Sequence, residues 1–321
     1  MVYELITPEV IRVYDEYRSD IGFSNAYLIL GERVILIDTG VKSKPTSILE
    51  ALKSVGKSLD DISYILLTHT HPDILGGLKW LSSKSKAIVC CSQPSADLLK
   101  NSEDILVKSF GVNKNFNLLL KHKGVDINFK SFNPGKIIVD KTILGVGDIQ
   151  LVVIESKGHC NGHLCFWIPQ YNILFSGDEL YPYFNKPNMF MIDRTGSFSK
   201  RVFSLKLFKE LKPQIICQVH DLPLVYGAVR AVSSALEIQD CWRSAVLEYF
   251  KLYNEASLLD VEKYVFRCFN VKLDSYIEKL ENHSTILKIL EFLEEEGLIE
   301  KTSAKSGAIE KQVWRIKNFD S

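Results

Sequence analysis

Short apolar runs with the character of strands alternate with helix-like stretches over the first two thirds of the chain. Residues 10–14, 26–30 and 34–37 are rich in branched apolar side chains and are bounded by glycines, which is typical of strands. Over residues 45–55 the apolar positions recur every three or four residues, which predicts a helix. Further strands are predicted at 62–67, 87–91, 137–139, 142–144, 149–154, 164–168, 173–175 and 215–219, and further helices at 74–81 and 198–211. This order predicts an α/β protein in which two sheets are sandwiched between helices.

Helical spacing takes over beyond about residue 225. Ser284 is expected to cap the last helix and Gly297 to end it. The predicted helices span 228–252, 258–269, 273–280 and 284–296, and a β-hairpin follows over 298–302 and 312–316. The chain is therefore predicted to divide into a first domain, residues 1–225, and a small helical, winged-helix-like domain, residues 226–321.

Composition narrows the range of partners. A length of 321 residues suits two domains. The 39 basic and 39 acidic residues give a formal net charge of zero, so net charge predicts no bulk electrostatic attraction to nucleic acid or to an anionic membrane. No apolar run approaches the roughly 20 residues that span a bilayer, and the N-terminus lacks the layout of a signal peptide. The seven cysteines include no Cys-x-x-Cys pair, which favours reduced thiols in a cytoplasmic protein without a membrane partner.

Histidines and aspartates follow the predicted strands. The run Thr68–Gly77 places two histidines and a carboxylate within five positions, directly after an apolar strand. Side chains at the carboxyl ends of neighbouring strands share one rim of a sheet, so separate strands can bring them to one point. Imidazole and carboxylate together suit zinc, iron or manganese. The residues in this setting are His69, His71, Asp73, His159, His163, Asp178 and His220.

Taken together, these segments resemble the metallo-β-lactamase superfamily, and most closely its β-lactamase-like and glyoxalase II-like branch. The resemblance covers about the first 225 residues and implies an αββα sandwich. It implies that His69, His71 and His159 hold a first metal, that Asp178 bridges, and that Asp73 and His220 hold a second metal. Asp73 would also be the catalytic residue that orients a water or takes its proton. The matching segments are Asp38–Gly40, Thr68–Gly77, Gly158–His163, Ser176–Asp178 and Val219–His220.

One position departs from the family pattern. The remaining ligand of the second metal falls on Ile74, which cannot coordinate a metal. Three potential ligands are left there, so we expect a weakened second site and one or two zinc ions per chain, with iron or manganese as alternatives. His163 is expected to support the site by hydrogen bonds instead of binding metal directly. Asp38 is expected to orient the loop that carries His69 and His71 (Thr68–Gly77), which we call the histidine loop. Capping of the turn at Thr39 and Gly40 is an alternative role for Asp38.

Two loop regions are expected to shape the substrate pocket. Residues 100–135 are polar and show no clear period, so we predict an insertion that leans over the site. Tyr181, Tyr183 and Phe184 follow Asp178 closely. These aromatic side chains either wall the pocket or pack in the core.

The C-terminal region resembles the helical and winged-helix tail of β-lactamase-like hydrolases, which include a single-strand-preferring endoribonuclease. Its last predicted helix is acidic, with Lys288 facing Glu291, Glu294, Glu295 and Glu296. A winged helix that binds duplex nucleic acid needs a basic recognition helix, so duplex binding by this helix is disfavoured, while nucleic acid stays an open alternative as a partner. Closing the pocket or forming a homodimer is favoured for this tail.

The leading hypothesis is a metal-dependent hydrolase that acts on an ester, thioester or lactone in a small-molecule substrate. Three alternatives stay open. The missing ligand at Ile74 raises the possibility of a mononuclear iron enzyme like the superfamily's sulfur dioxygenases. The tail raises that of a single-strand-specific endoribonuclease. A non-catalytic binding module is disfavoured by the six potential ligands.

Overall fold

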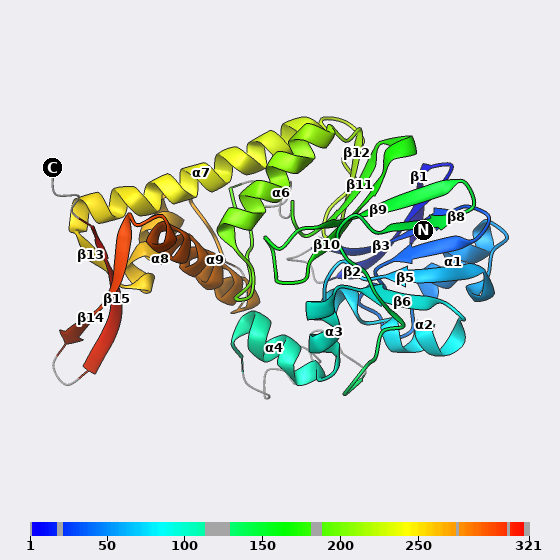
Figure 1. The fold of residues 1–321 in the computed structure, drawn as a ribbon, viewed down its shortest axis with the longest axis horizontal. Coiled ribbons are helices and arrows are strands. Elements are labelled where there is room, and N and C mark those ends of the chain that lie inside the picture. The colour runs from blue at the N-terminus through cyan, green and yellow to red at the C-terminus, as the bar shows by residue number, and fades with distance from the viewer. Residues whose placement is uncertain are drawn as a thin grey trace.

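The computed structural model describes residues 2–17, 22–112, 129–180, 188–273, 276–306 and 309–317. Two β-sheets lie face to face with helices on their outer faces, and further helices with a small sheet form the C-terminal end of the molecule (Figure 1). Within these ranges, every helix is too short or too polar to cross a lipid bilayer.

The first sheet contains seven strands in chain order. Strands β1 to β4 are antiparallel, whereas β4 to β7 are parallel. Parallel neighbours need a crossover connection, and the helices α1 (Thr46–Ser54) and α2 (Leu78–Lys84) lie in two of these connections. The strands are β1 (Tyr3–Thr7), β2 (Val10–Tyr17), β3 (Gly22–Leu30), β4 (Val34–Ile37), β5 (Ile62–Leu66), β6 (Ile88–Cys91) and β7 (Lys136–Ile137).

The second sheet has the order β12-β11-β10-β9-β8. Its pairs are antiparallel except for β11 and β12, which are parallel and connected through α6 (Phe198–Leu211). The strands are β8 (Ile143–Val146), β9 (Ile149–Glu155), β10 (Leu164–Ile168), β11 (Ile173–Gly177) and β12 (Ile215–Gln218).

Apolar side chains fill the three interfaces between these layers. Between the sheets, Ile35 and Leu66 of the first sheet share a buried cluster with Phe166 and Phe175 of the second. Residues of α1, α2 and α3 (Gln93–Leu99) pack on the outer face of the first sheet, and residues of α6 and of the start of α7 (Ala228–Tyr253) pack on that of the second. The predicted αββα sandwich is therefore confirmed, and burial of these apolar faces is the main force that holds its layers together.

The C-terminal elements share a core of their own. The second half of α7 packs there with the helices and strands that follow it, around Trp242, Phe250 and Trp314. We call this part of the molecule the C-terminal unit. Because the first half of α7 packs on the second sheet, one helix connects the two parts, and the domain boundary at residues 225 and 226 stays a prediction. The other elements are β13 (Glu255–Ala256), α8 (Leu258–Cys268), α9 (Tyr276–Glu295), β14 (Ile299–Ser306) and β15 (Ile309–Ile316), and the sheet order is β13-β15-β14.

Three sequence predictions need correction. Residues 100–135, in which the sequence shows no clear helical period, contain the helix α4 (Ser102–Phe110). Asn101 caps this helix, and it ends at Gly111, which has φ of 68°. The two helices predicted over 273–296 are one helix, α9, and Ser284 is buried inside it instead of capping it. Its polar stretch suggested a break, but Asn282, Ser284 and Thr285 of that stretch are buried. The winged-helix assignment stays a prediction.

The third correction concerns the helix expected at 74–81. The chain instead forms a 3-10 turn, η2 (Pro72–Ile74), and α2 starts only at Leu78. The break falls at Gly76, where an added Cβ would lie 2.0 Å from the carbonyl oxygen of Val41. This close approach of two backbones requires glycine, and it seats the histidine loop against the residues that follow β4.

Candidate metal centre

The predicted ligands lie at one edge of the two stacked sheets. His69 and His71 follow β5, His159 lies between β9 and β10, and Asp178 directly follows β11. His220 follows β12 after one residue. All of these side chains are buried. Strand ends from both sheets therefore deliver the predicted set to a single place, as the sequence suggested.

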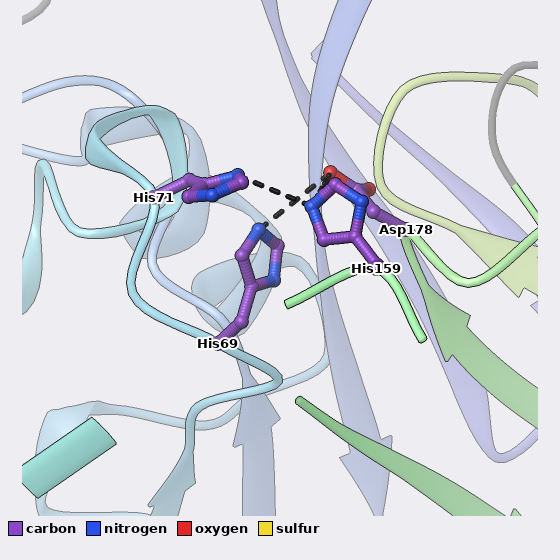
Figure 2. Close-up of side chains that lie close together, drawn as sticks. All are labelled: His69, His71, His159 and Asp178. Carbon is purple, nitrogen blue, oxygen red and sulfur yellow. Dashed lines mark hydrogen bonds and ion pairs between the residues drawn. The ribbon is translucent and has the colours of Figure 1, made fainter. Parts of the chain in front are cut away.

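Four of the six predicted ligands form one compact group. The ligand atoms of His69, His71, His159 and Asp178 all lie within 4.8 Å of one another. Nε2 of His159 lies 3.2 Å from Nδ1 of His71. Oδ2 of Asp178 lies 3.6 Å from Nε2 of both His69 and His159. Figure 2 shows the three imidazole rings and the carboxylate pointing toward a common centre.

Each of the three histidines uses its outward nitrogen for a hydrogen bond to the protein. The bonds join His69 Nδ1 to Thr68 Oγ1 (2.9 Å), His71 Nε2 to Asp193 Oδ2 (3.1 Å) and His159 Nδ1 to the Met191 carbonyl (3.3 Å). A carboxylate or carbonyl can only accept, so His71 and His159 donate from these outward nitrogens. The Thr68 hydroxyl donates to Asp38, and it therefore accepts from His69. When these rings are neutral, each inward nitrogen therefore carries a lone pair that a metal ion could use.

This arrangement fits a metal ion. Within the described part of the chain, Nε2 of His69 and Oδ1 of Asp178 are buried and have no hydrogen-bond partner. Such orphaned acceptors are costly unless a cation satisfies them. The 3.2 Å between the ligand nitrogens of His159 and His71 is close to the roughly 3.3 Å that tetrahedral zinc requires. Outer hydrogen bonds that fix the tautomer of each histidine are also the usual support of metal ligands.

Burial controls the ionisation of three site histidines. It lowers the pKa of His69, His159 and His163 well below the ordinary value, and the nearby histidines lower it further. These rings are therefore neutral at pH 7, which is the form that binds metals.

Carboxylates reverse this effect at the other two rings. Burial works to lower the pKa of His71, but the hydrogen bond and charge of Asp193 raise it above the ordinary value. Burial likewise opposes protonation of His220, but Asp178 and Asp73 raise its pKa well above the ordinary value. The local field of these carboxylates thus favours positive charge at the point where a cation would bind.

The predicted second set of ligands is also brought together. Nε2 of His220 lies 2.8 Å from Oδ2 of Asp73 and 3.4 Å from Oδ2 of Asp178. Asn25 of β3 positions the His220 segment, because its Nδ2 donates to the carbonyls of Gln218 (2.8 Å) and Asp221 (2.7 Å). Asp178 faces both sets of residues, which is the placement that a bridging carboxylate needs.

Ile74 adds nothing to this second set. Its side chain is fully buried and packs in the apolar cluster between the first sheet and its helices. Its main-chain carbonyl accepts hydrogen bonds from the amide and the hydroxyl of Thr39. The second set therefore offers three side chains, and the sequence position of the fourth holds an apolar residue that packs in this cluster.

Asp38 and His163 form hydrogen bonds to residues within or next to the predicted ligand set. Asp38 accepts from the amide and the hydroxyl of Thr68, both at 2.8 Å, so it supports the histidine loop through Thr68. Burial raises its pKa to about 8. His163 uses both ring nitrogens, one with the Ser156 hydroxyl (2.7 Å) and one accepting the amide of Asp178 (3.1 Å). It has no nitrogen left for a metal.

Sequence reasoning missed Asp193, which is buried and contacts His71 from 122 positions away. Its other carboxylate oxygen accepts from the amides of Thr195 and Gly196. In the sequence, an aspartate before Thr195 and Gly196 indicates only a turn.

Of the predicted pocket residues, Tyr181, Tyr183 and Phe184 lie outside the described residues. The ring of Phe110, at the end of α4, lies 4.9 Å from that of His71, so α4 does reach the site.

Gly177 is predicted to be indispensable to this geometry. It has φ of 53°, and an added Cβ would lie 2.4 Å from Nε2 of His163. Gly177→Ala should therefore lower the free energy of unfolding by roughly 2–5 kcal/mol, through backbone strain and displacement of His163. Urea denaturation measures this loss. Gly56→Ala is the matched control, because Gly56 has φ of 69° with nothing within 4 Å of the added Cβ, so it should show only a strain of about 1–2 kcal/mol. Equal losses in the two variants would contradict the proposed role of the His163 contact.

Comparison with known proteins agrees with this geometry. The sequence profile of the Metallo-beta-lactamase superfamily matches residues 19–220. The lactamase-like protein aptB of Emericella nidulans is 29% identical over 178 residues, which are 54% of this chain and 46% of that protein. The atrochrysone carboxyl ACP thioesterase of Aspergillus terreus is 24% identical over 184 residues, which are 55% of this chain and 45% of that protein. The chain thus spans less than half the length of these two relatives.

Similarity of fold extends further than similarity of sequence. The crystal structure of a metallo-beta-lactamase family protein from Thermus thermophilus aligns over 98% of this chain and 100% of that chain, with a TM-score of 0.72 and 19% sequence identity. At this identity the likeness shows a common fold. It includes the C-terminal unit as well as the sandwich.

Proposed function

Because this chain belongs to the metallo-beta-lactamase superfamily, whose members are typically hydrolases, we propose that it hydrolyses a small-molecule thioester, ester or lactone with a metal-activated water. The observation that carries the proposal is the convergence of three histidine nitrogens and one carboxylate on a single point. We assign His69, His71 and His159 to a first metal, Asp178 to a bridge, and Asp73 and His220 to a weaker second site.

A divalent cation at this centre would lower the pKa of a water and polarise the carbonyl oxygen of the substrate. The chain's own contribution is orientation. Ser24 donates to the Asp73 carbonyl (2.8 Å), which fixes the backbone of Asp73. The Asp73 carboxylate contacts His220 at 2.8 Å, and its side chain is 10% exposed, which is more than the 6% of the His220 side chain. There it would orient the attacking water and accept its proton.

Thioesters are our first choice of substrate class. The support is the name of the Aspergillus terreus relative, an acyl carrier protein thioesterase. We propose zinc as the metal, because histidine and carboxylate ligands with the observed separation suit it. Small-molecule thioesters are the natural first probes, since the described residues of the site include no basic cluster that would favour nucleic acid.

A second candidate function is favoured by Ile74. With an apolar side chain in place of a ligand, the centre can be mononuclear, as in the iron-dependent sulfur dioxygenases of the superfamily. Histidine and carboxylate ligands accept iron as well as zinc.

Metal analysis and a substrate panel together test the proposal. Protein purified without added metal should contain zinc and should hydrolyse acyl thioesters faster than lactones or single-stranded RNA. A chelator should remove the activity and zinc should restore it. One iron per chain, with oxygen consumed on a persulfide, would replace the hydrolase proposal with the dioxygenase one. Cleavage of RNA alone would indicate the endoribonuclease.

A further inference from the structure

The segment 188–193 lies between the metal centre and the C-terminal unit. On the side of the metal centre, the Met191 carbonyl accepts from His159 and the Asp193 carboxylate accepts from His71. The amide of Asp193 also donates to the carbonyl of His159 at 2.8 Å. Two of the three histidines thus take their orientation from this one segment.

The opposite side of the segment is held by the C-terminal unit. Met189, Phe190 and Ile192 are buried in the same apolar cluster as the core of that unit. The indole of Trp242 in α7 donates to the Asn188 carbonyl at 2.9 Å, and its ring lies 5.1 Å from that of Phe190. Figure 1 shows α9 running from this unit toward α4 and α6, which it contacts.

Thr285 of α9 makes the central contact. Its hydroxyl accepts a hydrogen bond from the amide of Ile192 at 3.0 Å and donates to the Glu281 carbonyl at 2.9 Å. Ile192 lies between Met191 and Asp193, the two residues that orient histidines. Both Thr285 and Ile192 are fully buried, so water cannot replace the hydroxyl when it is removed. The orphaned amide would then favour displacement of the segment toward another acceptor.

The sandwich supplies a separate support for the same residues. Arg201 of α6 donates from Nη1 to the carbonyls of Met191 (3.2 Å) and Asp178 (3.3 Å). This contact holds Met191 but does not reach the amide of Ile192, for which Thr285 is the acceptor. Loss of the Thr285 hydroxyl should therefore loosen the orientation of the histidines without removing the segment from its place.

We propose that Thr285 is a positioning residue of the metal centre, and that the C-terminal unit tunes metal affinity through the segment 188–193. The proposal rests on the proposed use of His71 and His159 as metal ligands. It gives the acidic α9 a role that requires neither nucleic acid nor a second copy of the chain.

Three substitutions in α9 test this role. Thr285→Val removes the hydroxyl with little change of shape, and it should weaken zinc binding about tenfold, the lower end of the loss seen when the partner of a ligand is removed. Thr285→Ser keeps the hydroxyl and should restore the affinity of the unmodified protein. Ser284→Ala is the matched control, since Ser284 is the buried neighbour and its hydroxyl has no hydrogen-bond partner within the described residues. It should leave zinc affinity unchanged.

Zinc affinity is measured on the full chain by competition with a chromophoric chelator, at a temperature where unfolding curves show each variant to be folded. A purely structural role would lower the unfolding midpoint of Thr285→Val and leave zinc affinity intact, which would overturn the proposal. Equal weakening by Thr285→Ser would overturn it too, because that variant keeps the hydrogen bond. Asp193→Asn serves as the positive control, with an expected loss of about 10–100-fold.

The outcome can be separated from that of the proposed function. If no thioester, ester or lactone is hydrolysed but Thr285→Val still weakens zinc binding, the positioning role stands and the substrate class is wrong. If zinc binding is unaffected in Asp193→Asn as well, the ligand assignment fails first. If zinc binding is weakened in Asp193→Asn but not in Thr285→Val, the proposal for Thr285 fails alone.

Discussion

Replacing His69 by alanine should remove the bound metal and abolish hydrolysis. His69 is buried, and its inward nitrogen has no hydrogen-bond partner within the described residues. We propose that a metal cation is its partner. Loss of an outer hydrogen-bond partner weakens metal binding about 10–100-fold, and loss of a ligand itself should exceed that. Turnover should fall by at least the roughly 10²–10³-fold that follows removal of one transition-state-stabilising group. Elemental analysis of the purified variant and initial rates on the best thioester of the panel measure both effects.

A second histidine provides the control for this experiment. His283 of α9 is partly exposed and pairs with Glu262 at 2.9 Å in the C-terminal unit. His283→Ala removes the same chemical group and should leave metal content and turnover unchanged. If His69→Ala kept a full equivalent of metal at the affinity of the unmodified protein, the assignment of the first site would be wrong.

Ile74→His should strengthen metal binding at the second site and weaken the metal-free fold. The new imidazole would join Asp73, Asp178 and His220, so the second metal should bind at least about tenfold more tightly. In the metal-free protein it would place a polar group in the apolar cluster that Ile74 now fills, which should lower the free energy of unfolding by about 1–3 kcal/mol. Added zinc should restore stability, because a ligand that binds only the folded state stabilises it. Zinc titration and urea denaturation with and without zinc measure the two effects.

Ile74→Leu is the control for volume and hydrophobicity. It keeps an apolar side chain of equal size, so it should cost less than about 1.5 kcal/mol and leave zinc stoichiometry unchanged. Two zinc ions per chain in the unmodified protein, bound as tightly as in Ile74→His, would show that another group already completes the second site. That result would also contradict the alternative of a mononuclear iron enzyme.

Local pattern was sufficient to predict most of the fold. The helix over 198–211 has the predicted bounds in the structure, as do the strands over 34–37 and 164–168. These segments carry a clear apolar period and clear ends. The prediction failed where tertiary contacts override local pattern. The middle of α9 looked like a helix end because it is polar, yet Thr285 is buried there against the segment 188–193.

The predicted ligands were recognisable because each follows a strand that the sequence itself reveals. Their supports were not. Asp193 and Thr285 look in the sequence like an ordinary turn residue and an ordinary helical residue. Their partners lie 122 positions away for Asp193 and 93 for Thr285. No local pattern records such a distance, whereas folding brings the partners within hydrogen-bond reach.

The sequence by itself determined the layered architecture and the residue types of the predicted ligands, because the period of apolar residues sets which elements form and these histidines and aspartates follow predicted strands. The tertiary structure decided how these ligands are oriented. It showed which nitrogen of each histidine faces inward, that both nitrogens of His163 are engaged, and that the C-terminal unit contacts the segment that hydrogen-bonds to His71 and His159. Orientation depends on hydrogen bonds between distant segments, and those exist only once the layers have packed.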